Sequence, residues 1–412
     1  MKVVRVTQGR LARMIATSTC IAMLAVGCAT PPPASDREAL AAFNETNDPY
    51  EPFNRAMLDF NLALDKALLK PVAYVYKEGV PDPLQINVTN FLSNLRGPVV
   101  FANDLLQGEF ERAGNTLLRF AMNSTIGILG INDFAAEAGV PKHTEDFGQT
   151  LATWQVEEGP YLVLPIFGPS NPRDGFGLLA DSLIDPFTWL TPFEFRIGRA
   201  VGQAVDRRAR AYDQLNDLEK NSLDFYAAIR SLYRQKRRDE IRNGAPATIK
   251  PVPGGLSGAP TTGAPATQQS NGLLHEAFDL PRIARFTLGR YWRTATDAEK
   301  TEFIDLFEKF VVQAYSARFQ DLSGKKLNVI QAREVSASQA LVLSEILIPG
   351  KPSVKINWRV RSKDEEHKIV DVMVEGISMS VTQRDEFAAV IRQTGGNIDG
   401  LIKALRRKTA SN

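Results

Sequence analysis

The sequence predicts a mainly helical N-terminal module joined to an α+β C-terminal domain with an antiparallel sheet. The first observation is a stretch at 244–272 that is rich in Gly, Pro and Thr, with Lys250 as its only charged residue. It has no helical or strand period, so we interpret it as a disordered linker between two folded parts. Apolar residues recur at spacings of three and four before this stretch, whereas alternation with period two begins only after it. A chain of 412 residues that is 44% hydrophobic can form two or three domains.

The first 46 residues have the pattern of an export and lipidation signal. Four basic residues precede an apolar run at 14–26, which is too short to span a bilayer. The run ends in Leu-Ala-Val-Gly-Cys, which resembles a lipobox and predicts that 1–27 is a lipoprotein signal peptide. Cys28 is then the acylated first mature residue, and 28–46 is a tether. The alternative is a secretory signal followed by an incidental cysteine. Ala29, in place of an aspartate, favours the outer membrane.

The clearest amphipathic pattern lies at 53–68. Its apolar residues recur at helical spacing: Phe53, Met57, Phe60, Leu64 and Leu68. Polar residues such as Asn54 and Asp59 fill the opposite face, and Pro71 is expected to end the helix. In most proteins such a stripe lies on the protein's own core. In a chain anchored at a membrane the stripe can equally lie in lipid, so both placements stay open.

Several more helices are expected before the linker, at 88–107, 109–129, 176–190 and 204–244. The longest uncharged candidate, at 120–132, has 13 residues, which is too short for an ordinary transmembrane helix. Many apolar helices without a spanning segment indicate a module, at 47–243, that lies within one leaflet of a membrane.

The segment after the linker, 273–412, changes its period twice. Helices are expected at 278–293 and 297–319, and Thr296 with Glu299 has the pattern of a capping box. Alternating apolar and polar residues then predict strands at 326–330, 341–347, 354–360 and 369–374. Two more helices are expected after them, at 383–393 and 398–407. Helices, then a sheet, then helices predict an α+β domain.

No catalytic, metal or cofactor site is expected. The G-x-G-x-x-A pattern at 175–180 matches a dinucleotide fingerprint, but Ser-Asn-Pro precedes it instead of a strand. His143, His275 and His367 are far apart without ligand spacing, and no nucleophile–base motif is evident. A net charge of +2 argues neither for nor against nucleic-acid binding, but no broad basic patch with interleaved aromatics is evident, so such binding is not expected.

The first module carries several specific motifs. They are D-P-x-E-x-F-N-R at 48–55, G-P-Y-x-x-L-P-x-x-G at 159–168, Arg173-Asp174, Ala180-Asp181, D-x-Y at 224–226 and Arg230. These motifs resemble the MlaA (VacJ) outer-membrane lipoprotein family over essentially all of 47–243. The resemblance implies a ring of helices embedded in the inner leaflet of the outer membrane. It also implies a central channel that removes mislocalised phospholipid from the outer leaflet, often in complex with a trimeric porin.

The second module carries A-R-F-T-L-G-R-Y-W at 284–292, F-x-x-x-F at 303–307, Tyr315, D-V-M-V-E-G-I-S at 371–378 and Gly400-Leu401. These motifs resemble MlaC, the periplasmic phospholipid-carrier family, over about 278–407. That family usually has further helical sequence ahead of this point, where this chain has its linker. The resemblance implies that some aromatic residues line an acyl-chain cavity; the candidates are Phe286, Trp292, Phe303, Phe307 and Phe310. Composition alone makes the same residues ordinary core.

Together these interpretations predict a lipoprotein of the outer membrane that transports phospholipid and has its C-terminal domain in the periplasm. The first module removes phospholipid from the outer leaflet, and the tethered second module receives it. The expected partners are phospholipid, the outer membrane, a trimeric porin and an inner-membrane lipid ABC transporter complex. The alternative is a structural envelope lipoprotein that uses both modules for protein contacts. A third hypothesis, a lipid hydrolase, lacks a nucleophile–base motif.

Overall fold

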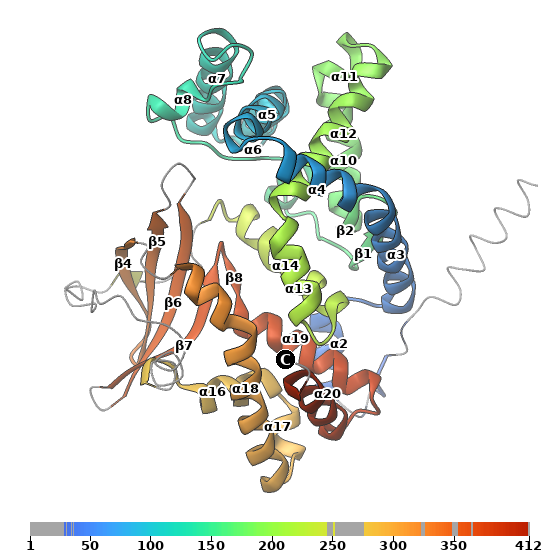
Figure 1. Cartoon of the computed structure of the whole chain (residues 1–412), viewed down its shortest axis with the longest axis vertical. Helices are drawn as coiled ribbons and strands as arrows, with labels where there is room; N and C mark the ends of the chain where they lie inside the picture. The colour runs from blue at the N-terminus through green and yellow to red at the C-terminus, as the bar shows by residue number, and fades with distance from the viewer. Residues whose placement is uncertain are drawn as a thin grey trace, which may run out of the picture. The chain divides into compact units, whose positions relative to one another are not determined.

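The computed structural model describes residues 29, 31–33, 35, 37–244, 250–251, 276–322, 326–347, 353–363 and 366–410 (Figure 1). The chain divides into two compact units, Met1–Asn216 (unit 1) and Asp217–Asn412 (unit 2). The predicted signal peptide, Cys28 and most of the predicted linker lie outside the described residues.

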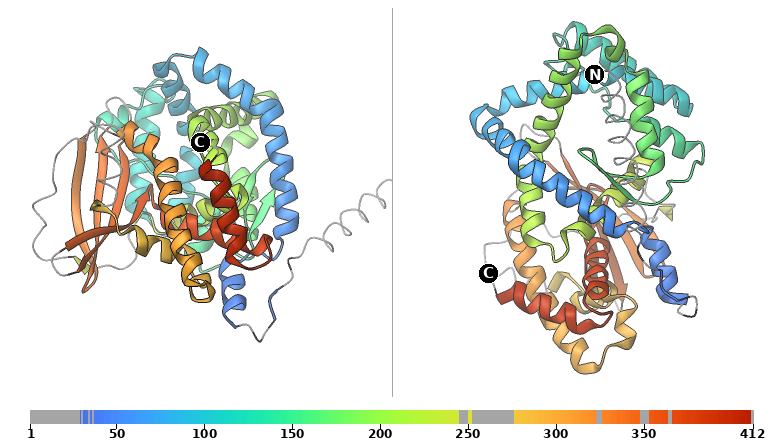
Figure 2. Two further views of the ribbon diagram at one scale, coloured as in Figure 1. Left: turned by 60° about the horizontal axis from the view of Figure 1, so that its bottom comes forward. Right: turned by 90° about the vertical axis from the view of Figure 1, so that its right-hand side faces the viewer.

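Unit 1 consists mainly of helices joined by short turns, as predicted. The helices are α2 (Arg37–Thr46), α3 (Glu51–Leu64), η1 (Asp65–Leu69), α4 (Lys70–Gly79), α5 (Asp82–Asn94), α6 (Gly97–Gln107), α7 (Phe110–Thr125), α8 (Phe134–Glu137), α9 (Phe147–Thr153), α10 (Pro172–Ile184), α11 (Pro186–Leu190) and α12 (Phe193–Arg210). Strands β1 (Leu162–Leu164) and β2 (Gly168–Ser170) form an antiparallel hairpin between α9 and α10. The right-hand view of Figure 2 shows the helices of this unit following one another around a ring.

The helix that begins at Glu51 runs on past the expected stop at Pro71. A π-helical turn, η1, follows α3 directly, and α4 then continues to Gly79 with Pro71 in its first turn. A proline in the first turn of a helix breaks no hydrogen bond of that helix, because its missing N–H would have no partner there. The expected end at Pro71 was therefore wrong.

Unit 2 contains a six-stranded antiparallel sheet in the order β3-β4-β5-β6-β7-β8. The strands are β3 (Lys250–Pro251), β4 (Lys326–Ser336), β5 (Gln339–Leu347), β6 (Val354–Lys363), β7 (Glu366–Val374) and β8 (Ile377–Ser378). Each strand pairs with the next strand in the chain, so the sheet is a meander. This confirms the predicted antiparallel sheet and the α+β class.

The helices of unit 2 are α14 (Phe225–Ile241), α16 (Leu280–Leu288), α17 (Tyr291–Thr294), α18 (Asp297–Leu322), α19 (Met379–Gln393) and α20 (Ile398–Ala410), and α13 (Tyr212–Asn221) crosses the boundary between the units. The core of unit 2 forms mainly between α16, α18, α19 and α20. Phe387 lies at its centre, with its ring centroid 5.8 Å from that of Phe303, 6.1 Å from Phe307 and 6.2 Å from Phe310. The capping box is present, because the Thr296 N–H donates to the Glu299 carboxylate at 2.7 Å and Thr296 Oγ1 accepts from the Glu299 N–H at 3.3 Å.

The compact units divide earlier than the module boundary that the sequence predicts. The sequence places 204–244 in the first module as one helix, whereas the structure separates this stretch into α12, α13 and α14. Residues from Asp217 onward belong to unit 2, where α14 packs against α19. Helix α14 belongs to unit 2 because buried polar contacts join it to α19. The pattern of polar and apolar residues along the chain does not predict these contacts.

Candidate functional site

The exterior of unit 1 is unusually apolar. Large hydrophobic side chains are exposed on almost every helix; examples are Val75 on α4, Phe110 on α7, Leu179 on α10, Leu190 on α11 and Phe193 on α12. Leu190 has 79% of its surface exposed. Exposing an apolar surface of this extent to water is unfavourable. Such a surface is therefore typical of a protein that contacts lipid or a partner.

The predicted stripe on α3 lies at this exterior. Phe60 is 47% exposed and Leu68 in η1 is 65% exposed, while Phe53, Met57 and Leu64 are half-buried. The stripe is therefore not the buried face of the helix. Instead, Asn54 and Leu58 are buried.

The opposite, polar face of α3 points into unit 1. Asn54 is fully buried and its Nδ2 donates to the Asp48 carboxylate and to the Tyr161 carbonyl, each at 2.9 Å. Its Oδ1 accepts from the Val163 N–H at 2.9 Å. Two turns further along α3, Asn61 Nδ2 donates to the Leu164 carbonyl, and Asn61 Oδ1 accepts from the Ile166 N–H. The side-chain amides of Asn54 and Asn61 thus hold the β1 segment against α3. Hydrogen bonds between polar groups, and not only apolar packing, stabilise this contact.

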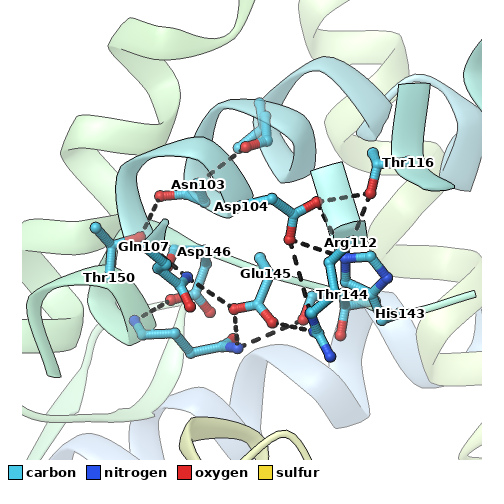
Figure 3. A network of polar contacts seen from close by, with 12 residues as sticks. Asn103, Asp104, Gln107, Arg112, Thr116, His143, Thr144, Glu145, Asp146 and Thr150 are labelled. Carbon is cyan, nitrogen blue, oxygen red and sulfur yellow. Dashed lines mark hydrogen bonds and ion pairs between the residues drawn. The ribbon is translucent and has the colours of Figure 1, made fainter. Parts of the chain in front are cut away.

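A larger polar network fills the space between α6, α7 and α9 (Figure 3). Asp104 accepts from the Thr116 hydroxyl at 2.7 Å, and its other oxygen lies 2.8 Å from His143 Nε2. Glu145 accepts from Gln107 Nε2 at 3.0 Å and forms an ion pair with Arg112. Burial raises the pKa of Glu145 above its ordinary value, although Gln107 and Arg112 act in the opposite direction.

Three members of this network have the donor atoms of a metal site. Asp104, His143 and Glu145 each offer one ligand atom, and these atoms lie within 4.8 Å of one another. This group was not predicted from the sequence: His143 and Glu145 stand two residues apart in one segment, but Asp104 lies 39 residues before His143, on α6. Arg112 bonds Glu145 and approaches Asp104 at 4.0 Å, so a guanidinium already balances the carboxylates. The arrangement therefore supports a polar core rather than a cation site.

A half-buried carboxyl group joins α10 to this region. Asp181 accepts from Asn103 Nδ2 and from the Phe147 N–H, both at 3.0 Å. Burial raises the pKa of Asp181 to about 6. Asp174, in the Arg173-Asp174 motif, is also buried and pairs with Asn171 and Arg173. Most polar motif residues of unit 1 thus lie inside it.

The five aromatic candidates of the C-terminal domain separate into two groups. Phe303, Phe307 and Phe310 are buried in the core of unit 2, where they pack against Phe387. Phe286 is 41% exposed, and Trp292 is half-buried beside the core. The role of all five in a lipid cavity stays a prediction.

Helix α14 and the two residues before it are bonded to α19 and to its N-cap residue, Ser378, mainly by side chains that the sequence analysis did not single out. The buried carboxylate of Glu386 accepts from the N–H groups of Leu223 and Asp224 at 2.8 and 3.4 Å. Asp224 caps α14 and accepts from Gln393 at 2.7 Å. Gln235 donates to the Thr382 hydroxyl at 3.0 Å and accepts from the Ser378 N–H at 2.8 Å. Burial raises the pKa of Glu386 to about 8.

An apolar exterior around a polar interior defines the class to which unit 1 belongs, that of proteins that work at a membrane. Among the described residues, no helix is long and apolar enough to cross a bilayer. The family model described as MlaA lipoprotein matches residues 46–240, and the chain belongs to this family. A second family model, described as MlaC protein, matches residues 260–407.

Curated relatives match the first half of the chain. The intermembrane phospholipid transport system lipoprotein MlaA of Shigella flexneri is 36% identical over 226 residues, which are 54% of this chain and 85% of that protein. The protein of the same name from Escherichia coli K12 is 35% identical over the same length. An uncharacterized protein of Rickettsia felis is 36% identical over 203 residues, 48% of this chain and 79% of that protein.

Two solved structures resemble parts of the chain. One, described as the structural basis for maintenance of bacterial outer membrane lipid asymmetry, is 37% identical and has a TM-score of 0.43. It covers 47% of this chain and 98% of its own chain. The other is a phospholipid-binding protein from Ralstonia solanacearum in complex with a phospholipid, 22% identical with a TM-score of 0.32. It covers 35% of this chain and 82% of its own chain.

Proposed function

We propose that this chain transports phospholipid between membranes and so maintains the lipid asymmetry of the outer membrane. Unit 1 lies in the inner leaflet of the outer membrane and takes phospholipid from the outer leaflet. The α+β domain receives that phospholipid on the periplasmic side. The observation that carries the proposal is the exterior of unit 1, where residues such as Phe110 and Leu190 are exposed over a polar interior. The names of the MlaA relatives support the same assignment.

A receiving domain on the same chain has a physical reason. The two acyl chains of a phospholipid would expose about 25 kcal/mol of apolar surface in water, at about 0.8 kcal/mol for each buried CH₂ group. A lipid that leaves the membrane therefore needs an apolar acceptor close to its exit. Keeping the acceptor on the same chain sets its effective concentration near the exit on the order of millimolar.

The anchor and the external partners belong to this proposal as well. Cys28 carries the acyl chains that hold the N-terminus at the outer membrane, although it lies outside the described residues. A trimeric porin holds unit 1 in place, and an inner-membrane lipid ABC transporter complex removes phospholipid from the α+β domain. Neither family that the chain matches is a family of enzymes, which supports transport over hydrolysis.

The direct test is the phospholipid content of the outer leaflet in a strain that lacks the chain. Labelling intact cells with a membrane-impermeant amine reagent reports phosphatidylethanolamine in that leaflet. We expect the label to rise on deletion and to return to normal with the full chain, but not with Cys28→Ser. Normal labelling in the deletion strain would exclude the proposal.

One observation favours a different function. Phe303, Phe307 and Phe310 pack against Phe387 in a filled core, and this arrangement suits a domain that binds protein instead of lipid. The alternative is thus a structural envelope lipoprotein that uses both units for protein contacts. Extracting the purified full chain with organic solvent separates the two, because only a transporter is expected to release a stoichiometric phospholipid.

A further inference from the structure

The surface of α16 and α17 carries a concentration of arginine residues. Between Leu280 and Thr296 the chain has four arginines and no acidic residue; they are Arg282, Arg285, Arg290 and Arg293. Within the part of the chain that the structure describes, Arg282, Arg285 and Arg290 form no ion pair with a carboxylate. These positive charges are therefore available to an anionic partner.

Aromatic rings lie among these guanidinium groups. The guanidinium carbon of Arg285 lies 5.9 Å from the ring centroid of Trp292, and that of Arg290 lies 4.7 Å from Tyr291. Arg384 of α19 adds a fifth arginine, 5.5 Å from the ring centroid of Phe286. Stacking on a ring holds a guanidinium through its face, so the N–H groups at its edge can still donate in the plane of the guanidinium, as Arg290 Nη2 does to the Tyr291 hydroxyl at 2.8 Å.

The kink between the two helices brings these groups together. Gly289 has a φ of +57°, in the region that favours glycine, and its N–H bonds the carbonyls of Arg285 and Phe286. The chain therefore turns sharply after α16, and Trp292 reaches back to Arg285. Phe286 is exposed in the same helix as Arg285, and its ring lies beside the guanidinium of Arg384, so an apolar ring adjoins a basic group.

We propose that this surface, formed by Arg282, Arg285, Phe286, Arg290 and Trp292, docks the α+β domain on an anionic lipid bilayer. Guanidinium groups bind lipid phosphates through paired N–H donors, and partly exposed aromatic rings favour the interfacial zone of a bilayer. The exposed Phe286 decides between a bilayer and an acidic protein, because an apolar ring among cations matches the boundary between headgroups and acyl chains. The proposal concerns docking and does not depend on transport by unit 1.

The test uses the full mature chain in phosphatidylcholine nanodiscs, held on a sensor through a C-terminal tag. The analyte is vesicles of phosphatidylcholine with about one-third phosphatidylglycerol, and pure phosphatidylcholine vesicles serve as the reference. Each basic residue near an anionic surface contributes about fivefold to binding. The triple variant Arg282→Gln, Arg285→Gln, Arg290→Gln should therefore lose on the order of a hundredfold in vesicle affinity.

A matched variant controls for net charge and folding. Lys309→Gln, Lys403→Gln and Arg406→Gln remove the same three charges from α18 and α20 of the same domain. We expect this control to keep at least most of the affinity, and Phe286→Ser to weaken binding without any change of charge. Equal losses in both triple variants, or equal capture of pure phosphatidylcholine vesicles, would overturn the proposal.

Two further outcomes are decisive. If the triple variant captures anionic vesicles normally but the full chain retains an acidic envelope protein only with the arginines intact, the surface binds protein and the proposal is wrong. If the chain does not enter nanodiscs, unit 1 lacks the proposed membrane placement, and the capture is run on the free chain. Binding of anionic vesicles by the free chain that falls in the arginine triple variant would still support the docking surface, and equal binding by both forms would refute it.

Discussion

Unit 1 and the α+β domain of unit 2 distribute polar and apolar groups in opposite ways. In unit 1, Asn54 and Asp104 are buried while Phe110 and Leu190 are exposed. In unit 2, Phe303 and Phe387 are buried in an ordinary aromatic core. The second arrangement is stable in water, whereas the first leaves apolar side chains exposed, which is unfavourable in water. The comparison supports the proposal that unit 1 works in lipid and the α+β domain works in water.

The largest effect is expected where unit 2 depends on its aromatic core. Phe387→Ala removes the ring that contacts Phe303, Phe307 and Phe310, and should cost about 3–5 kcal/mol of unfolding free energy. The control is Phe286→Ala, at an exposed position, where the cost should stay below about 1 kcal/mol. Amide hydrogen exchange in α18 and α19 of the full chain measures both. Equal losses of protection would contradict the described core.

A charge on the exterior of unit 1 tests the other half of the comparison. In water, Phe60→Asp at a half-exposed position would have little effect, whereas in lipid it should cost about 3 kcal/mol. We therefore expect it to impair outer-leaflet lipid maintenance, measured by the amine label described above. Asp59→Asn, at the neighbouring exposed position, is the control. A harmless Phe60→Asp would place this stripe outside lipid.

The buried amide of α3 tests the polar interior. Asn54→Ala leaves the Tyr161 carbonyl and the Val163 N–H without their partner, and should cost about 2–3 kcal/mol. Asp59→Ala, on the exposed face of the same helix, should change stability by less than about 0.5 kcal/mol. Hydrogen exchange at β1 in nanodiscs reports the difference. If the two variants behave alike, the Asn54 contacts have no stabilising role.

The two units should respond to pH in different ranges. Burial raises the pKa of Asp181 to about 6 and that of Glu386 to about 8, so the folded forms favour the protonated acids. In the unfolded chain these carboxyl groups have lower pKa values, so they lose their protons there first as the pH rises. The free energy of unfolding therefore falls as the pH rises. For unit 1 the fall runs from about pH 4 to pH 6, and for unit 2 from about pH 4.5 to pH 8. Asp181→Asn should flatten the first profile of hydrogen exchange against pH, and Glu386→Gln the second. An unchanged profile in either variant would assign that pH dependence to other groups.

Cutting the linker should have the smallest effect. A protease site inserted near residue 260 severs the chain between α14 and α16, but the contacts of Gln235 and Asp224 with α19 remain. We expect the two fragments to elute together after cleavage. The variant Gln235→Ala with Gln393→Ala removes two of these contacts and should promote their separation. Fragments of the unmutated chain that separate at once would show that only the linker holds them.

The sequence predicted those features of the fold that depend on the spacing of residues along the chain. The helical character of 53–68, the capping box at Thr296 and the strands of the α+β domain follow from spacing along the chain, and the structure has them. The motifs also led to the correct family, because they combine residue types at fixed positions. Pro71 was misjudged because a π turn before it shifts the start of the next helical segment.

Placement in three dimensions could not be predicted in the same way. Asn54 and Asp104 have the polarity of surface residues, and only their hydrogen bonds to distant segments show that they are buried. Phe286 and Phe303 are the same residue type in neighbouring helices, yet one is exposed and the other is buried. The group of Asp104, His143 and Glu145 was missed for the same reason, since Asp104 of α6 meets the segment before α9, which carries His143 and Glu145, only in the folded unit.

The position of α14 has a consequence for gene fusion. The MlaA match ends at residue 240, but the compact unit that contains the α+β domain begins at Asp217, so the two inherited segments share this helix. A recombination point at residue 240 or 260 would remove α14 and leave the carboxylate of Glu386 without the N–H groups of Leu223 and Asp224. The α+β domain therefore cannot be exchanged as an independent cassette at the family boundary, and a transferable segment has to begin upstream of α14.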